Sequence, residues 1–206
     1  MYNPFDYFVN GKFSFGVPAD PNGPILRLND GGMDFQNIPV APLLYRDVDI
    51  IVAVDNSGDT PSNWPNGTAL YTSMQWAQAR NIPFPIVPSP TQLVQSGNNT
   101  KPRFFGCNSN TGPLIVYLPA AAVINGANGV VNIGTVSFSV EANAVPVMIA
   151  NGQANALRPA GTPGANDVPS NWAQCVGCAV MARQLARASV PLPSVCRTCF
   201  NQLCYS

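Results

Sequence analysis

The sequence predicts an α/β fold from three features: apolar runs typical of buried strands, helical segments between them, and polar turns where the runs end. The strongest run is DVDIIVAV, from Asp47 to Val54, which is apolar on both faces as a central parallel strand would be. PLIVYLP, from Pro113 to Pro119, is also a buried-type strand. Ile25 to Leu28 is a shorter strand that ends at Asp30.

Two longer segments have helical composition. Thr68 to Arg80 places Leu70, Met74 and Ala77 on one face, and Trp172 to Ala188 follows a loop rich in glycine and proline. Together with the strands, they give the alternation of strands and helices that an α/β domain needs.

The intervening segments are less regular. Residues 81 to 90 hold four prolines and are expected to be a loop, and Thr91 to Gln95 is expected to begin a short helix. Val130 to Val140 alternates as a strand does, and Glu141 to Ile149 fits either a strand or a helix. Neither a repeat nor a linker is visible, so a single compact unit is the simplest organisation.

Composition excludes several classes of function. The 206 residues are 46% hydrophobic, enough for a sizeable core, and carry ten basic and ten acidic residues. Balanced, sparse charge argues against nucleic acid as a partner and against a polybasic membrane patch. No apolar run is long enough for a transmembrane segment. With no histidine, the chain contains neither a Ser-His-Asp arrangement nor a histidine-ligated metal site.

The cysteines allow two interpretations. The spacing C-x2-C-x17-C-x2-C is that of a zinc ribbon, but the first pair falls in a predicted helix and the total is even. We therefore favour disulfides over zinc, with the pairing left open. The six candidates are Cys107, Cys175, Cys178, Cys196, Cys199 and Cys204.

Two N-glycosylation sequons, at Asn66 and Asn98, also point to an oxidising compartment. The N-terminal residues lack the basic and apolar blocks of a signal peptide. Sequons and cysteines nevertheless lead us to expect a secreted, extracellular protein.

The stretch LRLNDGGMDFQNIP places Asp30 at the end of a strand and Gly31 and Gly32 directly after it. Strand ends of this kind collect ligands and catalytic groups in open α/β folds. On spacing alone, however, the pattern favours a plain strand-to-loop turn.

The chain resembles the fungal lysophospholipase, or phospholipase B, family, which is related to cytosolic phospholipases and patatins. The resemblance rests on NDGGMDFQNIPVAPLLYRDVDIIVAVDNSGDT, NWPNGTAL, TKPRFFGCN, PLIVYLP and the cysteine-rich tail NWAQCVGCAVMARQLARASVPLPSVCRTCFNQLCYS. It covers residues 22 to 119 and 141 to 206. Where the family generally has glutamate after the two glycines, this chain has Met33.

The resemblance implies part of a three-layer α/β/α catalytic domain with a cysteine-rich C-terminal helix and tail. It implies hydrolysis of acyl esters of (lyso)glycerophospholipids, in phospholipid catabolism, by a Ser-Asp dyad that needs no cofactor. Asp30 matches the dyad aspartate, which accepts the proton of the nucleophilic serine. Gly31 and Gly32 would form the supporting turn, with Asp34, Gln36 and Asn37 as polar supports.

The family's Gly-x-Ser-Gly-Gly nucleophile turn is absent from these 206 residues. Ser57 is the nearest imitation, and its place in the family pattern is structural. We therefore expect residues 1–206 to be the C-terminal portion of one catalytic domain, inactive without the nucleophile half. The partner would be a phospholipid or lysophospholipid at a membrane or micelle surface. The alternative is a non-catalytic, secreted, cysteine-stapled module that binds lipid or protein.

Overall fold

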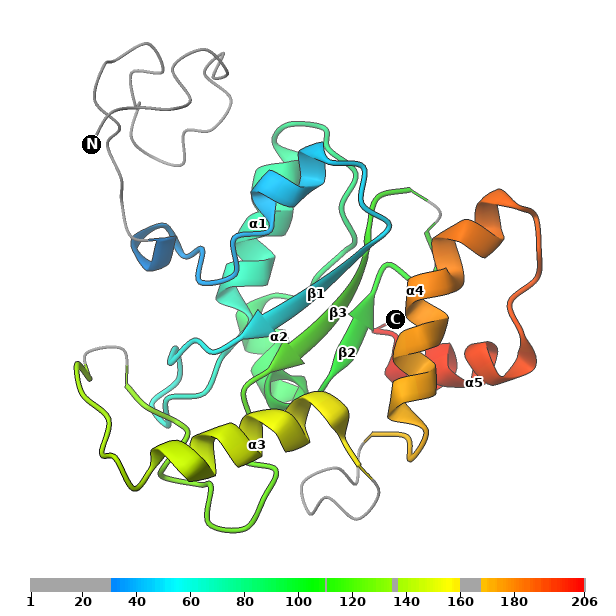
Figure 1. The fold of residues 1–206 in the computed structure, drawn as a ribbon. Helices are drawn as coiled ribbons and strands as arrows, with labels where there is room; N and C mark the ends of the chain where they lie inside the picture. The colour runs from blue at the N-terminus through cyan, green and yellow to red at the C-terminus, as the bar shows by residue number, and fades with distance from the viewer. Residues whose placement is uncertain (1–30, 110, 135–136, 160–167, 206) are drawn as a thin grey trace.

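The computed structural model describes residues 31–109, 111–134, 137–159 and 168–205. Within them the fold is mixed α/β (Figure 1), and the expected fold class is confirmed at that level. The strands are β1 (Ile50–Asp55), β2 (Arg103–Phe105) and β3 (Leu114–Pro119). The α-helices are α1 (Thr68–Gln78), α2 (Pro90–Gln95), α3 (Val145–Leu157), α4 (Trp172–Arg187) and α5 (Ser194–Leu203). Short 3-10 turns are η1 (Gly31–Asp34), η2 (Ala41–Tyr45) and η3 (Asn98–Thr100).

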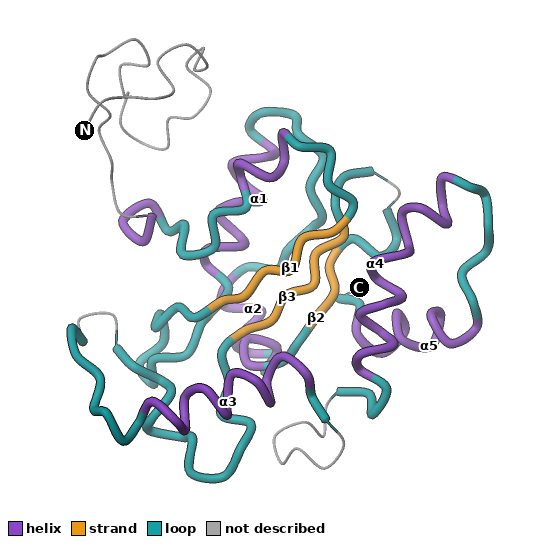
Figure 2. The backbone as a smooth tube through the Cα atoms, viewed as in Figure 1, coloured by secondary structure: helices purple, strands orange, loops and turns teal. Residues whose placement is uncertain are grey.

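The three strands form one mixed sheet in the order β1-β3-β2 (Figure 2). β1 pairs in parallel with β3, from Ile50 opposite Leu114 to Asp55 opposite Pro119, and β2 pairs antiparallel to β3. Among the described strands β3 is central and buried along its whole length, so the central position that the apolar run predicts for β1 is not found there. The strand expected over Ile25 to Leu28 lies outside the described residues. β1 is an edge strand of the described sheet.

Helices cover both faces of the sheet. On one face, Ile51, Ala53, Ile115 and Tyr117 pack with apolar side chains of α1 and α2. On the other face, Phe104 and the alternate β3 residues pack with α4 and α5. That second layer does not reach across β1, where Val52 and Val54 are 54% and 60% exposed.

Local sequence accounts for the helix starts on the first face. α1 begins after Gly67, whose φ of +83° favours glycine, and the N–H of Thr68 donates to Asn66 Oδ1 at 2.8 Å. α2 begins with a capping box, in which Ser89 and Gln92 satisfy each other's backbone N–H groups. Both predicted helices are confirmed, and the proline-rich loop between them is also found.

The C-terminal helices α4 and α5 form a hairpin joined by two disulfides. Cys175 bonds to Cys199 and Cys178 to Cys196, so each helix presents two cysteines three residues apart on one face. The third disulfide, Cys107–Cys204, ties the residue after α5 to the loop after β2. The disulfide interpretation is confirmed, and none of the six sulfurs is left to bind zinc.

The residues that follow α5 extend the sheet beside β2. Cys204 makes a parallel bridge with Phe104, and the N–H of Tyr205 donates to the Phe104 carbonyl oxygen at 2.9 Å. The Tyr205 ring lies 5.7 Å from that of Phe105, measured between centroids. The two edges of the described sheet therefore differ, since this segment pairs with β2.

α3 lies at the carboxyl end of β3 (Figure 1). Its buried side chains are asparagines: Asn155 donates to the carbonyl oxygen of Pro119 at 3.0 Å, and Asn151 to that of Ala121 at 2.7 Å. The segment Glu141 to Ile149 fits either a strand or a helix by sequence, and the structure shows that it contains the start of a helix, because α3 begins at Val145. The strand expected over Val130 to Val140 is wrong for its described residues, which form turns and irregular backbone.

Candidate functional site

The residues that follow Asp30 form a closed turn. Asp30 itself lies outside the described residues, which begin at Gly31. The N–H of Gln36 donates to the Gly31 carbonyl oxygen at 2.7 Å, and that of Phe35 to the Gly32 oxygen at 3.1 Å. A Cβ on Gly31 would lie 2.9 Å from the carbonyl oxygen of Gln36. Close backbone approach therefore calls for glycine at position 31.

Gln36 anchors this turn to α1. Its side chain is buried, and its Oε1 accepts a hydrogen bond from the Ser73 hydroxyl at 3.0 Å. The same hydroxyl lies 2.8 Å from the carbonyl oxygen of Ala69, one helical turn earlier. Ser73 is fully buried, so the contact is shielded from water.

Asn37 anchors the turn to the carboxyl end of β1. Its Nδ2 donates to Ser57 Oγ at 2.9 Å, and Ser57 Oγ donates to Asp55 Oδ1 at 2.6 Å. The Ser57 N–H also donates to Asp55 Oδ1, at 3.0 Å, and the Tyr117 hydroxyl donates to Asp55 Oδ2 at 2.7 Å. A carboxylate at the end of β1 is thus held by groups from its own turn and from β3.

The cluster is deeply buried. Asp55 and Tyr117 are 0% exposed and Ser57 is 4% exposed. Burial raises the pKa of Tyr117 well above its ordinary value, and the charge of Asp55 and its hydrogen bond add to this effect. Tyr117 therefore stays protonated and donates. Burial also raises the pKa of Asp59, against a hydrogen bond from the Asn66 backbone that lowers it.

Ser57 and Asp55 make the serine–carboxylate contact that a base-activated nucleophile uses. An ester carbonyl could not approach a hydroxyl that is 4% exposed and already bonded to Asn37 and Asp55. This geometry agrees with the structural, non-catalytic role that we expect for Ser57. The pair holds a turn in place.

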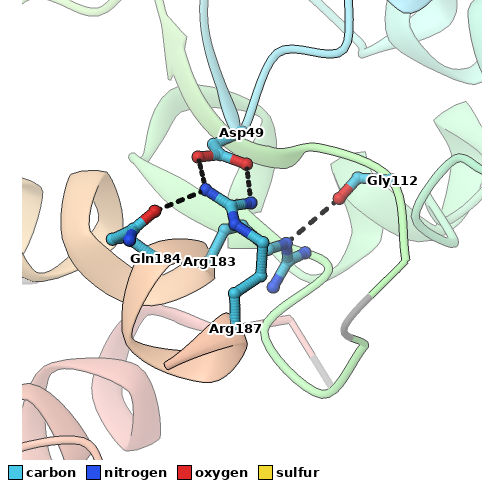
Figure 3. Close-up of polar contacts among 5 residues, drawn as sticks. All are labelled: Asp49, Gly112, Arg183, Gln184 and Arg187. Carbon is cyan, nitrogen blue, oxygen red and sulfur yellow. Dashed lines mark hydrogen bonds and ion pairs between the residues drawn. The ribbon is translucent and has the colours of Figure 1, made fainter. Parts of the chain in front are cut away.

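The opposite end of β1 has a small cavity of about 200 Å³. At its rim Asp49 receives two hydrogen bonds from Arg187, at 2.5 and 2.6 Å, and Arg187 also donates to Gln184 (Figure 3). The hydrogen bond from Arg187 lowers the pKa of Asp49. Of the predicted site residues that the structure describes, Gly31, Gly32 and Asn37 do not line this cavity, so the candidate site stays at the carboxyl end of the sheet.

The sequon asparagines differ in their contacts. Asn66 Oδ1 accepts from the Thr68 N–H, whereas Asn98 uses both ends of its amide. Asn98 Nδ2 donates to Ser96 Oγ at 2.9 Å, and its Oδ1 accepts from Arg103 Nε at 2.6 Å. Both side chains are partly exposed.

Sequence reasoning missed Tyr117 and Ser73. A tyrosine inside the otherwise apolar run PLIVYLP was an available signal, because a buried phenol needs a hydrogen-bond partner. Ser73 gave no such signal, since serine is common on helices and its partner lies 37 residues away. Among the described residues, no cluster of histidine, cysteine or acidic side chains has the geometry of a metal site.

Comparison with known proteins identifies the family to which this chain is similar. A family model described as "Lysophospholipase catalytic domain" matches residues 19–206. Lysophospholipase 2 of Aspergillus fumigatus is 40% identical over 195 residues, which are 90% of this chain and 32% of that protein. The lysophospholipase of Penicillium chrysogenum is 36% identical, over 100% of this chain and 33% of that protein.

A more distant relative is Lysophospholipase 1 of Candida albicans, 33% identical over 99% of this chain and 34% of that protein. This chain thus spans about a third of the length of these relatives. No solved structure matches it. The family match covers the Gly31 turn, the sheet and the disulfide hairpin, and the chain belongs to the lysophospholipase catalytic-domain family.

Proposed function

We propose that residues 1–206 are the aspartate-bearing, C-terminal portion of a lysophospholipase, or phospholipase B, catalytic domain of the three-layer α/β/α type. The reaction is hydrolysis of the fatty-acyl ester of a lysophospholipid or phospholipid at a membrane or micelle surface. Asp30 takes the proton of a nucleophilic serine and returns it to the leaving alcohol. No cofactor enters this scheme.

One observation carries the proposal: the family match includes the Asp-Gly-Gly stretch, and Gly31 lies in a turn anchored at the carboxyl end of a parallel strand. The relatives are named lysophospholipases, and such enzymes are carboxylic ester hydrolases. These names give no support to a non-catalytic binding module. Among described residues, no helix has the length and apolarity to cross a bilayer.

In this proposal the nucleophilic serine belongs to polypeptide outside these 206 residues, which contain no Gly-x-Ser-Gly-Gly. The test measures fatty-acid release from lysophosphatidylcholine by the chain alone and by the chain fused behind a complementing polypeptide. That polypeptide is the part of Aspergillus fumigatus Lysophospholipase 2 which this chain does not match. We expect no release from the chain alone and measurable release from the fusion.

Asp30→Asn should abolish that release, and Asp47→Asn is the matched control. Asp47 is an exposed aspartate before β1, and its φ of +50° is one that asparagine tolerates. Release that persists in Asp30→Asn, or that the chain alone supports, would overturn the assignment. Circular dichroism of each variant confirms that loss of activity is not loss of fold.

We also propose that the protein is secreted and carries N-glycans at Asn66, Asn98 or both. Three disulfides support an oxidising compartment. The test expresses the chain in a secretory host and measures the loss of mass on endoglycosidase treatment, beside Asn66→Gln and Asn98→Gln. An unchanged mass in the wild-type chain would refute the glycans.

A further inference from the structure

α3 has the opposite polarity to an ordinary surface helix. A surface helix of a globular protein buries an apolar stripe and exposes polar side chains. The fully buried residues of α3 are instead asparagines, Asn151 and Asn155. Its exposed apolar residues, which we call the α3 face, are Val145, Pro146, Ile149, Ala150, Ala156 and Leu157. Among the described residues of α3, Gln153 is the only exposed one with a polar side chain.

Polar bonds hold the inward side of α3 to the chain that follows β3. Asn151 Oδ1 accepts from the N–H of Val123 at 2.8 Å, and Asn151 Nδ2 donates to the Ala121 carbonyl oxygen at 2.7 Å. Asn155 Nδ2 donates to the carbonyl oxygen of Pro119 at 3.0 Å. Rotating the helix would leave these buried groups unpaired, which is costly. The inward hydrogen bonds therefore keep the α3 face pointing outward.

The α3 face and the chain around it are almost free of charge. Glu141 is the only charged residue between Arg103 and Arg158. Ile149 is 66% exposed, and Phe138, shortly before the helix, is 96% exposed. Exposed apolar side chains that gather on one face mark an interaction surface. Because an anionic surface attracts lysine and arginine, an uncharged face fits a partner without net charge.

The composition of the α3 face favours lipid over protein as that partner. Val145, Ile149 and Leu157 are aliphatic, and the six described residues of the face include none of the tryptophan, tyrosine and arginine that anchor most protein interfaces. Binding at a lipid interface requires buried apolar area and no matching shape. A helix suits that boundary because its backbone groups already bond to one another.

α3 also lies at the same end of the sheet as the candidate site (Figure 1). Pro119, which accepts from Asn155, is opposite Asp55 in the pairing of β1 with β3. Asp55 in turn accepts from Ser57, which bonds to Asn37 of the candidate turn. A surface bound to α3 would therefore lie beside the carboxyl end of the sheet.

We propose that the α3 face is a lipid-binding surface that attaches the chain to aggregates of zwitterionic phospholipid by apolar burial alone. The helix lies in the plane of the interface, with Val145, Ile149 and Leu157 among the acyl chains. The use of this surface in hydrolysis rests on the proposed function, whereas lipid binding itself does not.

The first test measures partitioning of the full chain onto sucrose-loaded vesicles of a dialkyl phosphocholine lipid, whose ether bonds cannot be hydrolysed. We expect wild type to sediment with the vesicles. Ile149→Gln combined with Leu157→Gln should lower the partition coefficient by about 10-fold or more, because two side chains lose their apolar burial. Raising the salt concentration should change the wild-type value by less than about twofold, since no charge takes part.

Two controls separate this surface from general stickiness and from unfolding. Ile86, in the loop between α1 and α2, is 71% exposed, so Ile86→Gln removes an equally exposed isoleucine elsewhere. Ile86→Gln should leave the partition coefficient unchanged. Glutamine is a good helix former and both replaced side chains are exposed, so circular dichroism should show wild-type helix content in the double variant.

The second test locates the contact by NMR in micelles of dodecylphosphocholine that carry a lipid with a spin label at the end of its chain. The amide signals of Val145 and Ile149 should lose intensity, whereas those of Ile86 and Val180 should keep it. Broadening that is absent from α3, or equal at all four amides, would overturn the inference.

The vesicle measurement also decides between lipid and protein as the occupant. A wild-type chain that does not partition, or an equal loss in Ile86→Gln, would overturn the inference. The same comparison is made in the fusion with the complementing polypeptide. Partitioning of the fusion that ignores the α3 substitutions would mean that the added polypeptide covers the face, which also overturns it. An inactive fusion that binds vesicles through α3 would count against the proposed function alone.

Discussion

Arg183 donates a hydrogen bond from Nε to the carbonyl oxygen of Gly112 at 3.0 Å (Figure 3). A second nitrogen of the same guanidinium donates to the Gly106 carbonyl oxygen at 2.9 Å. Arg183 is 5% exposed, and burial lowers its pKa. One side chain of α4 therefore holds both ends of the loop between β2 and β3.

Arg183→Ala should lower the free energy of unfolding by about 2 to 4 kcal/mol, because two partly buried carbonyl oxygens lose a charged donor. Arg183→Lys should recover only part of this loss, since an ammonium lacks the planar fork. Arg187→Ala is the control, as its guanidinium is exposed. Urea denaturation compares the three variants, and equal losses for Arg183→Ala and Arg187→Ala would contradict the assignment.

Tyr117→Phe should change the pH dependence of stability. The pKa of Tyr117 is raised in the folded state, so the unfolded chain loses this proton first, from about pH 10 upward. Stability from this group is complete below pH 10 and is lost as pH rises toward the folded pKa. The variant should be less stable at pH 8, by about 1 to 3 kcal/mol, with a shallower decline between pH 8 and pH 11. Urea denaturation measures the free energy of unfolding at each pH. Equal declines with pH in wild type and Tyr117→Phe would contradict the raised pKa of Tyr117.

The disulfides should contribute unequally. Cys107–Cys204 closes a separation of 97 residues, whereas Cys178–Cys196 closes 18 and lies inside the loop closed by Cys175–Cys199. In the loop-entropy description, removing the first pair costs about 4 to 5 kcal/mol and removing the second about 2 to 3 kcal/mol. Double-alanine variants in urea measure both. The reverse order would mean that packing of the buried pair outweighs loop closure.

β1 forms an edge of the described sheet, and we expect this edge to make the chain associate when it is alone. Val52 and Val54 of β1 are more than half exposed, and exposed apolar side chains on an edge strand favour association with another chain. Val52→Lys with Val54→Lys should shift sedimentation velocity profiles toward monomer. Val180→Lys, at a valine of α4 that is 52% exposed, should not. A monomeric wild-type chain would contradict this expectation.

Periodicity predicted the elements whose burial is one-sided or complete. β3 and α4 were predicted to within one residue at each end, because their apolar patterns reflect contacts they make in the fold. β1 was found as a strand, but its doubly apolar run predicted a central place that it does not occupy in the described sheet. The pattern records how apolar a strand is and not what covers it.

Other elements depend on contacts that periodicity does not report. α3 buries asparagines, which an apolar period does not reveal. The alternation over residues 130–140 indicated a strand that its described residues do not form. β2 is three residues long, too short to show a period. At the candidate site, Gly31 and Asn37 were predicted from the stretch around them. Ser73 and Tyr117 become part of the site only when α1 and β3 are brought to it.

The Cys107–Cys204 link has a consequence for how the protein is made. On the ribosome, β2 and the loop after it emerge 97 residues before their partner cysteine. During that interval, Phe104 lacks its partners Cys204 and Tyr205, and the Cys107 thiol is open to wrong pairings. The edge of the sheet at Phe104 and the Cys107 thiol therefore gain their partners only after α5 and the two residues that follow it have been synthesised.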